Sequence, residues 1–227
     1  MQKNILLPLT LMAGIALAVC QYLIYNYAPT EATMGLMQKI FYTHLPLAWW
    51  SFVSFFVVFV ASVAYLRTRN RRWDCLAASA AEIGVLFSGL ALITGSIWGR
   101  HSWGVWWTWD PRLTTTLVMW FVYAGYLVLR SMNMPRDRQA SVAAVVGIVA
   151  FVDVPLVFFS ARLWRSIHPA VFASKEGGLE PEMKITAIVC VLLFGLVWAA
   201  LTAIRYNQAR QTDRLDTLAS NASREAL

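Results

Sequence analysis

Charged residues are scarce in this chain of 227 residues: Asp, Glu, Lys and Arg make up 14% of it, whereas hydrophobic residues make up 59%. A soluble domain has about 25% charged and roughly 45–50% apolar residues. The apolar excess is concentrated in runs, which excludes a disordered chain. Several runs reach the ~20 residues that cross a bilayer as a helix, which argues against a single soluble core.

Cysteine and nucleotide-binding motifs are also scarce. The three cysteines, Cys20, Cys75 and Cys190, form no Cys-x-x-Cys pair. This argues against a zinc site, a dithiol redox site and covalent haem attachment to this chain. We interpret all three as small apolar packing residues.

No glycine-rich phosphate loop separates the apolar runs, so we expect no ATPase site.

Six apolar stretches predict an all-α polytopic membrane protein. They lack the period-two alternation of strands, and only helices and closed barrels span lipid. The first stretch follows Lys3 and resembles a secretory signal, but its length favours an uncleaved span. We expect a membrane domain at 1–205 and a polar cytoplasmic tail at 206–227. The predicted spans are residues 5–25, 45–66, 76–97, 113–129, 141–160 and 185–204.

The basic residues predict the orientation. If both termini lie on one side of six spans, that side receives 12 of the 19 Lys and Arg residues. The excess includes four arginines between residues 67 and 72. By the positive-inside rule, both termini are cytoplasmic. The net charge of +7 therefore reflects topology, and we expect a lipid bilayer and no nucleic acid as partner.

Tryptophans gather on the predicted outer side, above all in the loop at 98–112. Four indoles fall within seven residues there, too dense for the aromatic belt of an ordinary membrane protein. Indoles offer broad apolar faces and one N–H donor each. The segment therefore predicts a platform for a large planar apolar ligand. Its residues are Trp103, Gly104, Trp106, Trp107, Trp109 and Asp110.

All three histidines, His44, His101 and His168, are predicted on the same side. Two imidazoles on opposite sides of a porphyrin plane complete the coordination of its iron. Guanidinium groups pair well with the two propionates. The residues alone therefore predict an outward-facing haem site and leave its ligands open. The candidate propionate contacts are Arg100, Arg112, Arg162 and Arg165.

Two acids, Glu82 and Asp153, lie within predicted spans, where ionisable groups are costly and often functional. For Asp153 an alternative is structural, because Pro155 removes a backbone bond and an Asp can satisfy freed N–H groups at a kink. Glu82 either faces a partner subunit or reaches the interface. We expect no proton transport.

The motif Trp-Gly-x-Trp-Trp-x-Trp-Asp at 103–110 resembles the signature of the tryptophan-rich, haem-handling membrane proteins of cytochrome c maturation. Further matches at 42–46, 98–100, 111–114, 153–155 and 160–168 cover almost the whole chain and indicate the haem exporter protein C family. The resemblance implies six spans with cytoplasmic ends. It also implies that His44 and His168 are the axial ligands, with the tryptophans between them. His101 matches no ligand position, and Pro111 and Pro169 depart from the family pattern.

The resemblance further implies a haem carrier and not an enzyme. It would bind haem b non-covalently, in transit, at the periplasmic face of a bacterial inner membrane. Its implied partners are a membrane-anchored haem chaperone, a two-protein ABC transporter and a small single-span subunit. Three alternatives stay open: a b-type electron carrier, a structural scaffold, and a transporter that itself moves haem across the bilayer.

Overall fold

A computed structural model describes residues 3–164, 166–168 and 179–225. All the regular structure within these ranges is helical, apart from one isolated bridge between Glu31 and Gly35. Short π-helical and 3-10 turns occupy Leu23–Tyr27 and Leu36–Ile40. The α-helices are α1 (Lys3–Tyr22), α2 (Phe41–Thr68), α3 (Arg71–Trp103), α4 (Pro111–Ser131), α5 (Arg136–Ala150), α6 (Asp153–Leu163) and α7 (Pro181–Glu225).

Six helical segments are long and apolar enough to cross a membrane, which confirms the prediction of an all-α polytopic protein. The fifth segment consists of α5 and α6 together. Each segment contains the apolar stretch that predicted it and extends beyond it at one end or at both. The segments are Ile5–Tyr27, Leu36–Thr68, Arg71–Trp103, Pro111–Ser131, Arg136–Ser160 and Pro181–Ala219.

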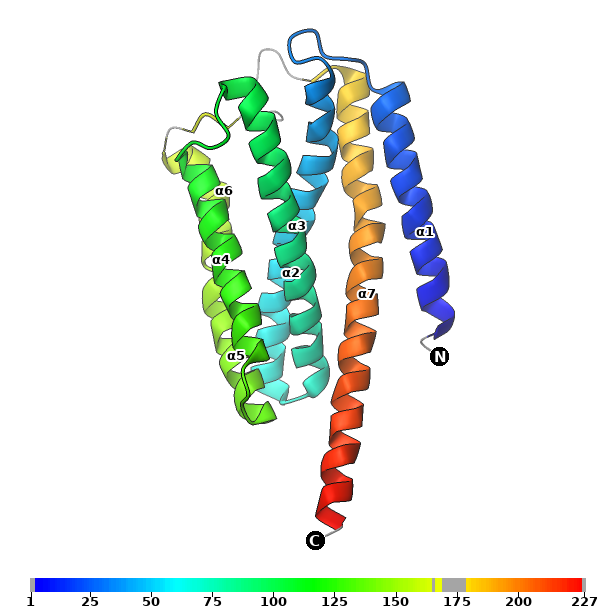
Figure 1. The fold of residues 1–227 in the computed structure, drawn as a ribbon, viewed down its shortest axis with the longest axis vertical. Helices are drawn as coiled ribbons and strands as arrows, with labels where there is room; N and C mark the ends of the chain where they lie inside the picture. Colours follow the sequence, from blue (N-terminus) through cyan, green and yellow to red (C-terminus); the bar gives the residue numbers. More distant parts are fainter. Residues whose placement is uncertain (1–2, 165, 169–178, 226–227) are drawn as a thin grey trace.

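The antiparallel pair α2 and α3 forms the centre of the bundle (Figure 1). Helices α1 and α7 pack on one side of the pair, and α4, α5 and α6 pack on the other. Two large apolar cores result, with a smaller cluster around Tyr65. The first contains Phe55, Met119 and Tyr123, and the second contains the buried thiols of Cys20 and Cys190. The cysteines in the described chain are free and buried, as their interpretation as packing residues requires.

The span predicted at 141–160 is confirmed as part of the segment Arg136–Ser160, and its helix is interrupted. Helix α5 ends at Ala150, and α6 begins at Asp153. Pro155 causes the break, because it has no N–H for the carbonyl of Phe151 and its ring clashes with that carbonyl. Asp153 makes no capping hydrogen bond at the break, and its buried Oδ2 has no partner among the described residues.

Both termini lie at the same end of the bundle (Figure 1). At this end a buried carboxylate, Asp74, accepts from Arg130 at 2.7 Å and pairs with Arg71 at 3.1 Å. Arg71 also reaches Asp213 of α7 at 3.1 Å. Helix α7 continues unbroken past residue 205, so the proposed tail begins inside a helix that the bundle holds.

Glu82 forms an ion pair with Arg205, which joins α3 to α7. At the opposite end of the bundle, the buried ammonium of Lys39 donates to the carbonyl of Ile24 at 2.8 Å. Lys39 thereby ties the connection between α1 and α2 to the end of the first span. These contacts therefore join neighbouring segments toward the two ends of the bundle.

Candidate functional site

The tryptophan-rich segment is the connection between α3 and α4. Helix α3 ends at Trp103, and Gly104 follows in the left-handed conformation with φ of 74°. Glycine adopts this conformation without steric cost, which is why it terminates helices. At the other end, Asp110 caps α4 by accepting from the N–H of Arg112 at 2.9 Å, and Pro111 occupies the first turn. Both ends of the segment are therefore fixed.

The segment is also bonded back onto α3. Ser96 Oγ donates to the carbonyl of Trp106 at 2.7 Å, and the guanidinium of Arg100 donates to the carbonyl of Gly104. Gly99 leaves room for the Trp103 ring, because a Cβ there would lie 3.1 Å from it. Arg100, a predicted propionate contact, thus holds the tryptophan segment in this structure.

The indoles form edge-on pairs. Trp98 and Trp103 have ring centroids 5.5 Å apart at an angle of 87°, and Trp107 and Trp109 lie 6.1 Å apart at 81°. Trp106 and Trp109 are 60% and 78% exposed. Aromatic faces this exposed at the end of a bundle are available to a planar apolar ligand.

His44 lies in the first turns of α2 and is half-buried against α3. Its Nδ1 is 3.1 Å from Thr94 Oγ1. The ring rests on Gly95, where a Cβ would lie 3.0 Å from the imidazole Cε1. A helix backbone, a glycine and a hydroxyl therefore define the position of this imidazole.

His168 lies outside the helices and is held by α4. Its Nδ1 is 3.2 Å from Arg112 Nη1. A guanidinium only donates, so Nδ1 is the acceptor in this contact. The N–H of His168 donates to Ser166 Oγ at 3.1 Å, and Ser166 Oγ donates to Asp110 Oδ1 at 2.9 Å.

Asp110 is the residue that connects these parts. Besides capping α4, it accepts from the N–H of Ile167 at 2.8 Å. From the sequence we expect Asp110 to orient the platform through indole N–H or backbone N–H bonds, and its observed backbone partners are the N–H groups of Arg112 and Ile167. In the structure this carboxylate positions the outer segment that carries His168.

The observed contacts place the predicted residues against two consecutive helices. Helix α3 supports His44, helix α4 supports His168, and the tryptophan segment joins α3 to α4. His101 is exposed in the last turn of α3. The side chains of Arg162 and Arg165 lie outside the part of the chain that the structure describes. Sequence reasoning missed Thr94 and Ser166, because an isolated hydroxyl in an apolar helix or a loop has no distinctive pattern.

Four buried polar atoms around the segment have no hydrogen-bond partner within the described residues. Buried groups of this kind are rare and require an explanation. Indole N–H and hydroxyl groups can donate to a carboxylate, and the adjacent Arg112 supplies a positive charge. Such donors beside exposed apolar rings fit a planar ligand with acidic substituents, such as haem. The atoms are Trp98 Nε1, Trp107 Nε1, Thr108 Oγ1 and Thr114 Oγ1.

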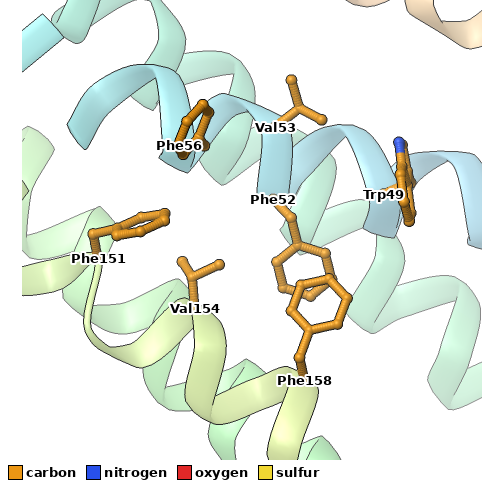
Figure 2. A pocket seen from close by; sticks show the side chains of 7 residues that line it. All are labelled: Trp49, Phe52, Val53, Phe56, Phe151, Val154 and Phe158. Carbon is orange, nitrogen blue, oxygen red and sulfur yellow. The ribbon is translucent and has the colours of Figure 1, made fainter. Parts of the chain in front are cut away.

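Two hollows lie along α6, the first between α6 and α2 and the second between α6 and α4. The first has a volume of about 270 Å³, and every side chain that lines it is apolar, including Trp49, Phe52 and Phe158 (Figure 2). The second, of about 440 Å³, is lined by Arg112, Pro155, Phe158 and Phe159. Phe158 lines both hollows, so the apolar flank continues to the guanidinium that contacts His168.

Six helical segments that are long and apolar enough to cross a membrane define a multi-pass membrane protein. The family model for heme exporter protein C matches residues 1–220. The chain belongs to this family. It is accordingly a membrane component of heme export for cytochrome c maturation.

Curated relatives agree with the family match. The chain is 32% identical over 200 residues to heme exporter protein C of Haemophilus influenzae, covering 87% of this chain and 78% of the relative. It is 36% identical over 177 residues to that of Bradyrhizobium diazoefficiens, covering 77% and 67%. The protein of the same name from Escherichia coli K12 is 30% identical over 181 residues, covering 80% and 74%.

Proposed function

We propose that this chain binds haem b non-covalently at the periplasmic end of its bundle, with His44 and His168 as axial ligands. The observation that carries the proposal is the connection of the two histidines. The helices that support them are consecutive, and the tryptophan segment lies between these helices. A planar ligand with an iron at its centre can then meet an imidazole from each side and apolar indole faces around its edge.

The remaining polar groups suit the propionates. Arg112 contacts the proposed ligand His168. It also lines the second hollow, which continues from the apolar flank. Indole N–H and threonine hydroxyl groups supply further donors. Imidazole coordination is exchangeable, which suits a carrier that releases haem. We infer that the chain passes haem to a membrane-anchored haem chaperone during the biogenesis of c-type cytochromes.

The proposed location is a bacterial inner membrane with both termini in the cytoplasm. The positive-inside rule supports this orientation, because the arginine cluster around Arg71 lies at the same end as the termini. The chain would act without an ATPase site of its own. Its proposed partners are therefore a two-protein ABC transporter, which supplies ATP hydrolysis, and a small single-span subunit.

The test is the absorption spectrum of detergent-purified protein, produced in cells that make haem, beside the variants His44→Ala and His168→Ala. We expect near-stoichiometric haem with a bis-imidazole low-spin spectrum in the wild type and a disturbed spectrum in both variants. His101→Ala is the matched control, because His101 is exposed at the same end, and it should retain the wild-type spectrum. A low-spin spectrum that survives both ligand substitutions would refute the assignment.

A further inference from the structure

The two proposed ligands are held in different ways. The Nδ1 of His168 accepts from the guanidinium of Arg112, so the neutral imidazole carries its proton on Nε2, and Nδ1 is the nitrogen that would bind iron once Arg112 releases it. The Nδ1 of His44 faces a hydroxyl, which can either donate or accept. The direction of the His44 hydrogen bond decides which ring nitrogen carries the proton, and thus which nitrogen is available to iron.

The other contacts of Thr94 favour one direction, and the backbone of Ala91 is a further hydrogen-bond partner of the His44 ring. A threonine hydroxyl has a single proton. Thr94 Oγ1 donates it to the carbonyl of Leu90 at 2.8 Å, one turn earlier in α3, with the carbonyl of Ala91 at 3.1 Å. The lone pairs of Oγ1 remain, and they accept the Nδ1–H of His44. The proton of the imidazole therefore lies on Nδ1, and Nε2 carries the lone pair that a metal requires.

From this geometry we propose that Thr94 is a positioning residue for haem coordination: it accepts the Nδ1–H of His44 and so presents Nε2 as the coordinating nitrogen. The inference rests on the proposed function and adds a residue outside the tryptophan motif. Histidine ligands commonly donate their second N–H to such an acceptor, which orients the ring and makes the ligand more basic. A more basic ligand favours ferric over ferrous iron.

The local packing supports a positioning role. Gly95 leaves the imidazole little room to move, because a Cβ at this position would lie 3.0 Å from Cε1. Thr94 lies beside it in α3 and determines the rotation of the ring about its Cβ–Cγ bond. The hydroxyl of Thr94, which is the acceptor, is bonded to carbonyls of its own helix, those of Leu90 and Ala91. It is therefore held as rigidly as α3 itself.

The experiment compares Thr94→Val with Thr94→Ser in the full-length, haem-loaded protein. Valine keeps the shape of threonine and removes the acceptor, whereas serine keeps the hydroxyl. We expect Thr94→Val to lower haem retention by about tenfold or more. We also expect it to reduce the low-spin fraction and raise the midpoint potential of the bound haem. Thr94→Ser should restore all three properties.

Thr186→Val is the matched control. Thr186 is buried in α7 and its hydroxyl also bonds a carbonyl one turn earlier, that of Glu182, at 2.8 Å. The Thr186→Val variant should leave the haem spectrum and the midpoint potential of the haem unchanged. Equal effects of Thr94→Val and Thr186→Val would assign the change to helix packing and overturn the inference.

His44→Ala separates the inference from the proposed function. If His44→Ala disturbs the low-spin spectrum while Thr94→Val changes neither spectrum nor potential, Thr94 has no positioning role and the ligand assignment stands. If His44→Ala leaves the spectrum unchanged, the proposed ligand itself is wrong, and the inference fails with it.

Discussion

The carboxylate of Asp110 accepts the backbone N–H of Ile167 at 2.8 Å, a hydrogen bond that spans 57 residues of sequence. The same side chain caps α4 by accepting from Arg112. One acid therefore couples the end of the tryptophan segment to the outer segment that carries His168. Through its bond to Ile167, Asp110 positions the imidazole of His168 beside the first turn of α4.

Asp110→Ala removes these two bonds and the one from Ser166 Oγ. We expect a loss of about 0.5–2 kcal/mol of stability from the cap and, in addition, a loss of haem retention. The control is Asn70→Ala, which removes the corresponding cap of α3 at the opposite end of the bundle, where Asn70 accepts from Arg72 at 3.0 Å. Thermal unfolding in detergent and haem content measure the two effects. Equal haem content in the two variants would contradict the role of Asp110.

Arg112→Lys keeps the positive charge and removes the planar fork of donors. Lysine cannot bind a carboxylate in the bidentate manner of arginine. We expect haem retention to fall by about tenfold, as is typical when an outer-shell partner is lost. Arg138→Lys, an exposed substitution near the start of α5, is the control and should be neutral. Equilibrium transfer of haem to apomyoglobin measures retention, and wild-type retention in Arg112→Lys would exclude a haem contact.

Trp109→Ala should reduce haem binding with little change in stability, because the indole is 78% exposed. Trp198→Ala should instead lower the stability of the bundle and leave haem binding almost unchanged. Trp198 stacks on Trp50 at 5.1 Å and donates to Ser54 Oγ at 2.7 Å within the bundle. Its loss should cost on the order of 3 kcal/mol. Haem titration and thermal unfolding of both variants test this separation, and a stability loss of similar size in both would contradict it.

Asp74→Asn should destabilise the bundle without changing the haem spectrum. Asp74 is buried and pairs with Arg130 and Arg71, so its neutralisation leaves two half-buried cations without this counter-charge. Removing one partner of such a network costs about 3–5 kcal/mol. Glu82→Gln is the comparison, because the side chains of Glu82 and Arg205 are 35% and 46% exposed. Exposed ion pairs contribute less than about 1 kcal/mol, so its unfolding temperature should stay near the wild-type value.

The sequence by itself determined the class of fold, because apolar runs of sufficient length have few stable states other than transmembrane helices. It also located the tryptophan segment and placed His44 and His168 on one side, since the number of spans decides which loops share a face. The break at Phe151 was foreseeable in part, because Pro155 is visible in the sequence.

Only the tertiary structure decided how these residues are held. The contacts of His44 with Thr94, of His168 with Arg112 and of Asp110 with Ile167 join residues that are 50, 56 and 57 positions apart. Each depends on the packing and register of neighbouring helices. Hydropathy and spacing determine which residues lie near the same end of the bundle. The direction of each side chain depends on helix rotation and on small residues such as Gly95, which only the packed bundle reveals.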